Sequence, residues 1–372
     1  MKENRTILQI IATLAPAGAE LLLLNICKGL MEYRPGKYKF KVLALIEKGI
    51  LEERFKSTDI PVEIIPRPKA NGFSRCFQVM RVIRQFSPDI VHTHLLPSDK
   101  FGLSAALFCG IKNRISTIHN CEPDRSLKDT LWDEVIARMA TRFISVSQSA
   151  KSLWVSRHFP ESRIHVIPNA PAFQAAKNVR SKDHPGKGHI LKLVNVARIN
   201  PQKGQLFLVR AMKYLLDSGF QVTLDIYGIG EEKDVVMIKN EIELLHLSSS
   251  VYLKGRTDTL ADLLPDYDIM VSSSLYEGMP LACIEGMGAG LPIVCTDIRP
   301  HREIFGYCPD DIFAQASDPI SLSNAISRVA TDQSLYNRLS RANFENARLF
   351  SKESMIQRYD QFYDSLIDPC VQ

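Results

Sequence analysis

The sequence predicts an α/β protein with two parallel β-sheets, each covered by helices. Short runs rich in β-branched residues alternate with helical stretches along the whole chain, which is the pattern of parallel strands joined by crossover helices. The 372 residues are enough for two domains of ordinary size. Between the two halves, residues 171–189 interrupt the alternation with prolines, glycines and charged residues, which is typical of a linker.

In the first half, short apolar runs predict the strands, and longer stretches with apolar residues on one face predict the helices. The expected strands are 6–12, 39–46, 61–65, 89–93, 114–118, 142–146 and 164–167. The expected helices are 18–31, 74–86, 98–109, 127–140 and 148–157. The first of these runs also imitates a signal peptide, since Ala15-Pro-Ala17 follows it. A strand is preferred because the run is short and Glu20 and a Leu-rich helix follow directly.

The second half continues the alternation. The expected strands are 190–197, 222–227, 250–253, 269–272, 292–295 and 311–314. The expected helices are 203–217, 231–245, 258–264, 281–289, 317–330 and 333–348. A final helix is predicted from Lys352 to Ile367, because its aromatic and apolar residues share one helical face: Met355, Ile356, Tyr359, Phe362, Tyr363 and Leu366.

The composition is that of a soluble globular protein, with 45% hydrophobic and 23% charged residues. No stretch reaches the roughly 18 uninterrupted apolar residues of a membrane-spanning helix. The eight cysteines are scattered, mostly within apolar runs, and none forms a Cys-x-x-Cys pair. They therefore predict reduced core residues in a cytoplasmic protein and argue against a disulfide framework or a zinc site.

The formal charge of +5 is unevenly distributed. Residues 1–172 contain 25 basic and 16 acidic residues, a net charge of +9, and the remainder carries −4. Between Pro66 and Pro88, five basic residues occur without an acidic one: Arg67, Lys69, Arg75, Arg81 and Arg84. Two interpretations stay open: solvated helix faces, or a surface attracted to anionic lipid headgroups or an acidic acceptor. A nucleic-acid partner is not expected, since no nucleic-acid-binding motif accompanies the charge.

The most informative stretch runs from Leu275 to Val294. It places Glu277 and Glu285 eight positions apart, with the turn Gly278-Met279-Pro280 and a helix start at Leu281 between them. A helix N-terminus behind such a turn offers free backbone N–H groups and the positive end of the helix dipole, which suit a diphosphate or sugar hydroxyls. Glu285, about one turn into this helix, is placed to accept hydrogen bonds from a diol.

Three other strand ends of the second half carry residues suited to a nucleotide. Arg198 and Lys203 follow the first strand, and ligands of open α/β sheets bind beyond such strand ends. Both suit a diphosphate, because the Arg198 guanidinium can donate two parallel hydrogen bonds and the Lys203 ammonium is a compact positive charge. Gly228 and Gly230 form a Gly-x-Gly turn after the next strand, which permits close approach to a nucleotide. The segment Lys254-Gly255-Arg256 follows the third strand.

This pattern resembles the donor-site signature of retaining GT-B glycosyltransferases, most closely family 4 (glycosyl transferases group 1) of the bacterial surface-polysaccharide type. The resemblance covers nearly the whole chain and is strongest in residues 195–296. Family members have an Arg and a Lys-Gly at positions matching Arg198 and Lys203, a similar Gly-x-Gly, and main-chain contacts to the base at the segment matching residues 254–256. This chain departs from the family's usual glycines at three places: Ala17, Ala170 and Ala197.

The resemblance implies the GT-B architecture, in which two Rossmann-like, doubly wound domains face each other and a C-terminal helix crosses back to the first. The first domain would comprise residues 1–172 with the helix 351–368 and bind the acceptor. Residues 173–189 would form the linker, and residues 190–350 the nucleotide-sugar donor domain.

The resemblance also implies a hexosyltransferase-type enzyme that retains the anomeric configuration. The donor would be a nucleotide-diphospho sugar, with a UDP-sugar favoured, and the acceptor a hydroxyl of a glycan or lipid-linked glycan in cell-surface polysaccharide biosynthesis. Arg198 and Lys203 would stabilise the departing diphosphate. Glu285 would hold the ribose, and Glu277 with the amides of the turn that follows it would hold the sugar. Such an enzyme is expected in the cytoplasm, peripherally on the inner face of the membrane.

Two histidines end consecutive strands of the first half, His94 and His119. A histidine at such a place is more often a structural group. The family has a histidine near His119 that lies by the transferred sugar, so His119 is preferred as the assisting residue. Gly18, in the loop after the first strand, is expected to let the backbone approach the donor phosphate or the acceptor.

No metal cofactor is expected. Asp266 and Asp268 form an Asp-x-Asp sequence of the kind that holds a metal in another glycosyltransferase architecture, but here the sequence runs into a strand start. Two cationic side chains and a helix dipole can replace the charge of a metal. Two other functions stay open: a nucleotide-sugar epimerase or sugar phosphorylase on the same fold, and a catalytically silent sugar-nucleotide binding protein.

Overall fold

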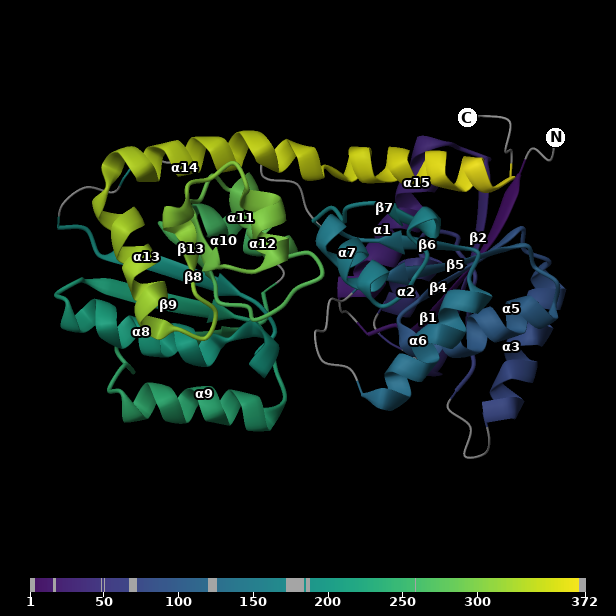
Figure 1. The fold of residues 1–372 in the computed structure, drawn as a ribbon, viewed down its shortest axis with the longest axis horizontal. Coiled ribbons are helices and arrows are strands. Elements are labelled where there is room, and N and C mark those ends of the chain that lie inside the picture. The colour runs from purple at the N-terminus through teal and green to yellow at the C-terminus, as the bar shows by residue number, and fades with distance from the viewer. Residues whose placement is uncertain are drawn as a thin grey trace. The chain divides into compact units, whose positions relative to one another are not determined.

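A computed structural model of the chain describes residues 4–15, 18–47, 49, 51–66, 72–119, 126–171, 184, 188–257 and 259–367. The chain forms two compact units (Figure 1). Unit 1 comprises residues 1–172 and 352–372, and unit 2 comprises residues 173–351. The expected linker at 173–189 lies outside the described residues except for residues 184, 188 and 189.

Unit 1 contains a seven-stranded parallel sheet in the order β3-β2-β1-β4-β5-β6-β7. Its strands are β1 (Arg5–Thr13), β2 (Tyr38–Glu47), β3 (Val62–Ile64), β4 (Ile90–His94), β5 (Asn113–Ile118), β6 (Arg142–Ser145) and β7 (Ile164–Val166). All seven predicted strands are confirmed, with ends shifted by at most one residue. The order reverses between β1 and β4, and doubly wound sheets bind ligands beyond the carboxyl ends of strands at such a switch point.

Strand β1 is apolar because helices cover both faces of the sheet. Ile7 and Ile11 pack with α1 (Gly18–Tyr33), α2 (Leu51–Lys56) and α15 (Lys352–Ile367). Leu8 and Ile10 point to the other face and pack with two further helices, α3 (Gly72–Phe86) and α5 (Ser104–Phe108). Since side chains alternate along a strand, Gln9 lies on the same face as α15.

The remaining helical segments of unit 1 are α4 (Leu96–Ser98), the π-helical turn Asp99–Leu103, α6 (Leu127–Met139), α7 (Gln148–Ser156) and the 3₁₀ turn Glu161–Arg163. The helix expected at 98–109 is therefore wrong as a single α-helix. The hydroxyl of Thr93 donates to the Asp99 carboxylate at 2.5 Å, where the π-helical turn begins. The short α2 was not predicted.

The last helix, α15, belongs to unit 1, which confirms the predicted return of the chain to its first domain. Its apolar face packs against α1, where Gly29 leaves space: a Cβ there would lie 2.5 Å from Cδ1 of Ile356. Its polar face is held by Asp360, which accepts hydrogen bonds from the Tyr38 hydroxyl at 2.6 Å and from Lys37 at 2.7 Å.

Unit 2 contains a six-stranded parallel sheet in the order β10-β9-β8-β11-β12-β13. Its strands are β8 (Leu191–Val196), β9 (Val222–Tyr227), β10 (Val251–Gly255), β11 (Ile269–Ser272), β12 (Ile293–Thr296) and β13 (Phe313–Ala314). Its helices are α8 (Gln205–Asp217), α9 (Glu232–Leu244), α10 (Leu260–Leu263), α11 (Leu281–Gly288), α12 (Arg299–Phe305), α13 (Pro319–Thr331) and α14 (Gln333–Asn346). Here the order reverses between β8 and β11.

The sequence prediction differs from unit 2 at two elements. The strand expected at 311–314 is reduced to β13, because a 3₁₀ turn occupies Asp310–Ile312. Helix α12 was not predicted; it carries Pro300 in its first turn, where proline is tolerated. Among the described residues, no helix combines the length and the apolar character needed to cross a membrane.

Candidate functional site

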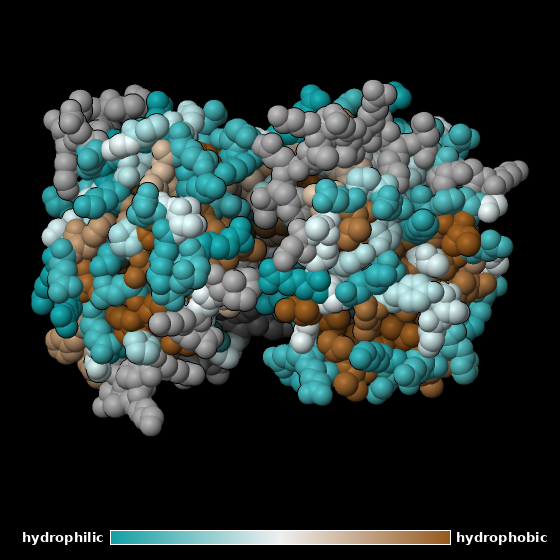
Figure 2. Space-filling view, turned by 180° about the vertical axis from the view of Figure 1, so that it is seen from behind, coloured by the Kyte–Doolittle hydropathy of each residue, from teal (hydrophilic) through white to brown (hydrophobic). Residues whose placement is uncertain are grey.

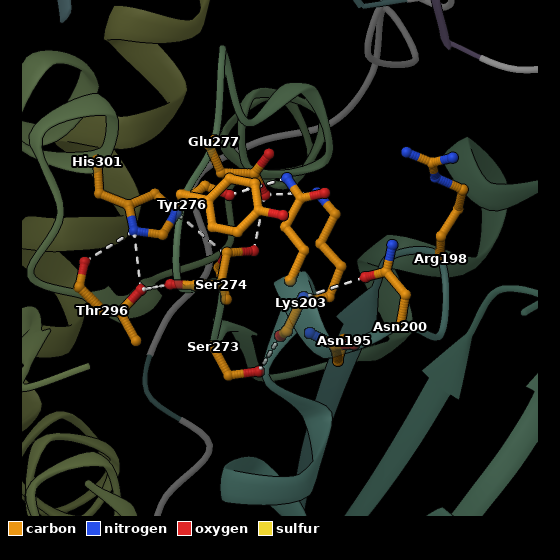
Figure 3. Close-up of polar contacts among 12 residues, drawn as sticks. Asn195, Arg198, Asn200, Lys203, Ser273, Ser274, Tyr276, Glu277, Thr296 and His301 are labelled. Atoms are coloured by element: carbon orange, nitrogen blue, oxygen red, sulfur yellow. Dashed lines mark hydrogen bonds and ion pairs between the residues drawn. The ribbon is translucent and has the colours of Figure 1, made fainter. Parts of the chain in front are cut away.

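The candidate site of unit 2 lies at the carboxyl ends of β8 and β11, on the two sides of the switch point (Figure 3). The segment after β8 contributes Arg198 and Lys203, and the segment after β11 contributes Ser274 and Glu277. The register of these neighbouring parallel strands brings together residues that are about 75 positions apart in the sequence.

Lys203 and Glu277 form an ion pair with 2.5 Å between Nζ and Oε1. The Ser274 hydroxyl donates to the same carboxylate oxygen at 2.7 Å. The Lys203 side chain is 17% exposed and that of Glu277 only 8%. The sequence assigned these residues separately to a diphosphate and to a sugar, whereas the structure joins them into one buried, hydrogen-bonded group.

The backbone around Lys203 is fixed by the segment after β11. The Asn200 side chain accepts a hydrogen bond from the Lys203 N–H at 3.2 Å, and the Ser273 hydroxyl donates to the Lys203 carbonyl at 2.8 Å. Gly204 has a left-handed φ of 63°, and a Cβ there would lie 2.1 Å from the Ser273 carbonyl oxygen. Gly204 therefore lets the two segments approach closely enough for the ion pair to form.

Arg198 lies apart from this group (Figure 3). Its side chain is exposed, and among the described residues its guanidinium has no hydrogen-bond or ion-pair partner. Its backbone carbonyl accepts a hydrogen bond from the buried Gln205 side chain at 2.8 Å, which fixes the position of the main chain. Among the described residues, Arg198 thus offers an unpaired planar cation on the same segment that carries the paired Lys203.

Backbone packing explains why glycine occupies both positions of the Gly-x-Gly turn after β9. A Cβ on Gly228 would lie 1.8 Å from the Ala197 carbonyl oxygen, and one on Gly230 would lie 2.1 Å from the Ile199 carbonyl oxygen. Both glycines therefore let the β9 turn pack against the backbone that carries Arg198. Gly255 accepts a hydrogen bond from the Gly228 N–H at 2.8 Å and so extends the same packing to β10.

The residues flanking Gly255 are on the surface of unit 2. The Lys254 side chain pairs with Asp225, with 3.6 Å between Nζ and Oδ2. Arg256 is exposed. The segment therefore presents two cationic side chains next to a glycine turn.

Helix α11 starts at the residue predicted. Pro280 precedes it, and its carbonyl accepts the Cys283 N–H at 3.0 Å, while the Leu281 N–H donates to the Met279 carbonyl at 3.0 Å. Gly278 is buried and follows Glu277 directly, so the turn and the helix start lie against the ion pair. Glu285 is half-buried in the middle of the helix.

A fully buried histidine beneath the site was missed by the sequence analysis. His301 of α12 faces the Thr296 carbonyl oxygen through Nδ1 at 2.7 Å and the Ser272 hydroxyl through Nε2 at 3.1 Å. Thr296 in turn donates to the Ser274 carbonyl at 2.5 Å, which links His301 to the segment bearing Glu277. Burial lowers the pKa of His301, so the ring is neutral and supports the segment by hydrogen bonds.

Asp268 lies at the opposite end of β11 from the site. Its carboxylate accepts hydrogen bonds from the Lys192 N–H at 2.8 Å and from His189 at 2.9 Å. Asp266 ends a 3₁₀ turn two residues earlier. These contacts agree with the interpretation of Asp268 as a strand-entry residue.

In unit 1, the loop after β1 and the start of α1 lie at the switch point. Gly18 opens α1, and no atom of the described residues lies within 4 Å of a Cβ added there. Glu20 is buried and accepts a hydrogen bond from the Thr13 hydroxyl at 3.1 Å, which gives it a structural role. Ala17 lies outside the described residues.

His119 follows β5 and lines a pocket of about 260 Å³ together with Ser116 and Thr117. Its Nε2 lies 3.2 Å from Nδ1 of His94, so the structure joins the two histidines that the sequence singled out. Burial lowers the pKa of His119 to about 4 and that of His94 well below its usual value. Both rings are therefore neutral at neutral pH.

Family models match both units. The model described as "Glycosyltransferase Family 4" matches residues 16–170, and the model described as "Glycosyl transferases group 1" matches residues 178–346. The chain is 26% identical over 307 residues to the UDP-Gal:alpha-D-GlcNAc-diphosphoundecaprenol alpha-1,3-galactosyltransferase of Escherichia coli, covering 78% of each chain. It is 21% identical to the capsular polysaccharide biosynthesis glycosyltransferase CapH of Staphylococcus aureus, covering 96% of this chain and 98% of that one.

Solved structures share the fold. Anabaena Alr3699/HepE in complex with UDP and glucose superposes with a TM-score of 0.82 at 19% identity, covering 97% of this chain and 100% of that one. This similarity extends over both units and identifies the fold as that of the GT-B glycosyltransferases.

Proposed function

This chain belongs to the GT-B glycosyltransferases of group 1 and family 4, and from that membership we propose that it transfers a sugar from a UDP-sugar to a lipid-linked or glycan acceptor in surface-polysaccharide synthesis, with retention of configuration. One observation carries the proposal: the Lys203–Glu277 pair, the start of α11 and Arg198, whose guanidinium has no partner among the described residues, lie at one switch point. Cations beside a carboxylate suit a ligand that is anionic at one end and hydroxylated at the other.

The choice of donor and acceptor rests on the relatives. The E. coli relative is named for UDP-Gal and for a diphosphoundecaprenol-linked acceptor, and the Anabaena structure contains UDP. The S. aureus relative is named for capsular polysaccharide biosynthesis. They support UDP as the nucleotide and a lipid-linked acceptor, whereas the residues of the site leave the sugar open.

In the proposed complex, Arg198 and Lys203 neutralise the departing diphosphate. Glu277 accepts hydrogen bonds from the donor sugar, and the amides of Gly278 and Met279 stabilise the same group.

Glu285 holds the ribose hydroxyls. The α11 start at Pro280 and Leu281 supplies the positive end of the helix dipole to the anion. The glycine turns of β9 and β10, with Lys254 and Arg256 beside them, face the base.

Retention follows in this proposal without a covalent enzyme intermediate. Glu277 is engaged by Lys203 and Ser274 through the same oxygen, an arrangement suited to binding rather than to nucleophilic attack. The acceptor hydroxyl attacks the anomeric carbon on the face from which the diphosphate leaves. The new C–O bond forms as the sugar–phosphate bond breaks, and a phosphate oxygen takes the hydroxyl proton. The alpha linkage in the name of the E. coli relative supports this outcome.

His119 assists by orienting the transferred sugar, and the reaction needs no metal, because the cations and the helix dipole supply the positive charge. The enzyme works in the cytoplasm and contacts the inner face of the membrane peripherally, where lipid-linked acceptors are presented.

A panel of UDP-, GDP- and ADP-sugars in a thermal-shift experiment tests the donor. A ligand at 100 times its Kd adds about 2.7 kcal/mol to the stability of the folded chain, so a UDP-sugar should give the largest rise in melting temperature. Product analysis with and without acceptor then tests the reaction. Sugar transfer only when the acceptor is present is expected, and NMR coupling at the new anomeric centre reports retention. An altered sugar nucleotide without acceptor would indicate an epimerase, transfer to inorganic phosphate a phosphorylase, and binding without reaction a silent protein.

A further inference from the structure

A group of hydrogen-bonded polar side chains inside unit 1 begins on the last helix of the chain and ends at His119. Its members are Gln9 of β1, His92 and His94 of β4, His119 after β5 and Tyr363 of α15. All except His119 are 0% exposed. Polar groups buried so deeply are costly unless they are hydrogen-bonded, so their arrangement is specific.

The contacts form a continuous path from α15 to His119. Tyr363 Oη lies 3.1 Å from Gln9 Nε2, and Gln9 Oε1 lies 2.9 Å from His94 Nε2. Nδ1 of His94 lies 3.2 Å from Nε2 of His119. A branch leads from Tyr363 Oη to Nδ1 of His92 at 2.8 Å, and from Nε2 of His92 to the Thr117 hydroxyl at 2.6 Å.

Each histidine in the path has one donor and one acceptor nitrogen. Burial lowers the pKa of His92 to about 3 and that of His119 to about 4, and it lowers the pKa of His94 well below its usual value. All three rings are therefore neutral at neutral pH, with a single ring proton each.

The orientation of the Gln9 amide determines which ring nitrogen of each histidine carries its proton. Its oxygen faces Nε2 of His94, so that nitrogen donates and Nδ1 of His94 accepts. Nε2 of His119 must then donate to Nδ1 of His94, which leaves Nδ1 of His119 without a proton. On the other side, the Gln9 amide nitrogen donates to Tyr363, whose hydroxyl donates to His92. Every contact in the path has a donor and an acceptor in this assignment.

We propose that Gln9 and Tyr363 are positioning residues that, through His94, hold His119 in the Nε2-protonated tautomer and thereby present its Nδ1 as a hydrogen-bond acceptor for a hydroxyl of the transferred sugar. The inference rests on the proposed function, in which His119 orients that sugar. It makes α15 part of the site, because the helix supplies the hydroxyl at which the path begins. It also explains why a polar residue, Gln9, interrupts the apolar face of β1.

The opposite tautomer is the competing arrangement. A Gln9 amide turned by half a rotation would reverse every donor and acceptor along the path, and Nδ1 of His119 would then carry the proton. Long-range ¹H–¹⁵N correlation spectra of the full chain with ¹⁵N-labelled histidine distinguish the two, since a protonated and a bare ring nitrogen have separate shifts. The His119 signals are assigned by their loss in His119→Asn.

In the wild type we expect a protonated Nε2 and a bare Nδ1 on His119. Gln9→Met removes both amide contacts at similar volume, and Tyr363→Phe removes the hydroxyl that fixes the amide. Both variants should show a mixture of the two tautomers. Tyr38→Phe is the matched control: it also deletes one buried hydroxyl bonded to α15, at Asp360, but lies outside the path.

Steady-state kinetics provides a second measurement. The two path variants should raise the KM for the sugar donor several-fold, while the Kd for free nucleotide stays at the wild-type value, and Tyr38→Phe should change neither. A wild-type His119 protonated on Nδ1, or an unchanged tautomer in both Gln9→Met and Tyr363→Phe, would overturn the inference. If His119→Asn turned over the donor normally, the role of His119 in the proposed function would fail, whereas the tautomer result would stand by itself.

Discussion

Lys203 and Glu277 hold each other at 2.5 Å, yet the proposed donor needs both of them. A diphosphate competes with Glu277 for the ammonium group, and sugar hydroxyls compete with Lys203 for the carboxylate. The pair therefore keeps both side chains in position at a small electrostatic cost, because each charge is compensated before the donor arrives. Arg198 has no such partner among the described residues and supplies the uncompensated charge.

We expect Arg198→Ala and Lys203→Ala each to weaken binding of the nucleoside diphosphate and to lower kcat by about 100-fold or more. Both remove positive charge from the place where negative charge develops on the leaving group. Lys213→Ala, which removes an exposed lysine of α8 paired with Asp217, is the matched control. Calorimetry and initial rates measure the effects. Turnover at the wild-type level in both site variants would refute the assignment.

Substitutions of Glu277 and of Glu285 are expected to differ in their effects on the binding of free UDP and on the turnover of the intact donor. Glu277→Gln leaves Lys203 without its counter-ion, so binding of free UDP should be maintained or strengthened while turnover of the intact donor falls. Glu285→Ala should instead weaken binding of free UDP, since it removes the acceptor for the ribose hydroxyls. Calorimetry with UDP alone and with the UDP-sugar distinguishes the two. Equal losses of UDP affinity in both variants would show that the division is wrong.

The sequence identified the charged residues of this site but not their arrangement. Arg198, Lys203, Glu277 and the start of α11 are recognisable because they follow strand ends next to glycine turns. The pairing of Lys203 with Glu277 is set by the register of β8 and β11, which the sequence does not state. His301 was missed for a different reason, because the short helix that carries it was not predicted.

At the scale of elements, the parallel strands were the most predictable part of the fold. Strands such as β11 and β12 are buried on both faces and therefore read as continuous apolar runs between turn residues. Short helices such as α2 and α12 carry too few turns to show a helical period. The π-helical turn after Ser98 depends on a side-chain contact with β4, which no local pattern reveals.

The loop between β8 and α8 depends on Gly204. We expect Gly204→Ala to destabilise the chain by more than the ~1–2 kcal/mol of a left-handed alanine, because its Cβ would lie 2.1 Å from the Ser273 carbonyl oxygen. Gly219→Ala is the control in the same unit, since Gly219 also has a positive φ but has open space around it. Urea unfolding of both variants measures the difference. Equal losses of unfolding free energy in the two variants would mean that the backbone around Gly204 moves away from the added Cβ at little cost.

The position of Asp268 relative to β11 is relevant to whether the reaction uses a metal ion. Asp268, the residue before β11, is fixed at the amino end of the strand by Lys192 and His189, away from the carboxyl end that Glu277 follows. We expect turnover to be unchanged by EDTA, because the proposed charge stabilisation comes from Arg198 and Lys203. Loss of activity with EDTA that Mg²⁺ or Mn²⁺ restores would show that a metal acts in the reaction.

At the scale of the whole molecule, the charge is divided between the units. The first 172 residues carry +9 and the remainder −4, although the acceptor and the donor are both expected to be anionic. On the face that Figure 2 shows, hydrophobic areas interrupt the hydrophilic surface. The combination of excess positive charge and exposed apolar side chains favours a surface of unit 1 that meets an anionic membrane.

The structure narrows this surface to helix α3 and its surroundings. Phe73 and Phe77 are 79% and 68% exposed, and Arg81 and Arg84 follow them in the exposed class. Phe108, on the neighbouring α5, is also exposed. One member of the predicted surface is buried instead: Arg75, whose guanidinium lies over the Phe101 ring. Arg67 and Lys69 lie outside the described residues.

We therefore predict reversible, salt-sensitive binding of the chain to anionic vesicles through α3. Arg81 and Arg84 would each contribute about 1 kcal/mol near an anionic surface, within a Debye length of about 8–10 Å. Phe73 and Phe77 would add an apolar anchor that salt does not screen. Phe73→Ser with Phe77→Ser should lower binding at all salt concentrations, whereas Arg81→Gln with Arg84→Gln should lower it mainly at low salt. Leu244→Ser, an exposed apolar position of unit 2, is the control. Sedimentation with anionic and neutral vesicles measures the binding, and equal recovery with both would mean that α3 presents only a solvated face.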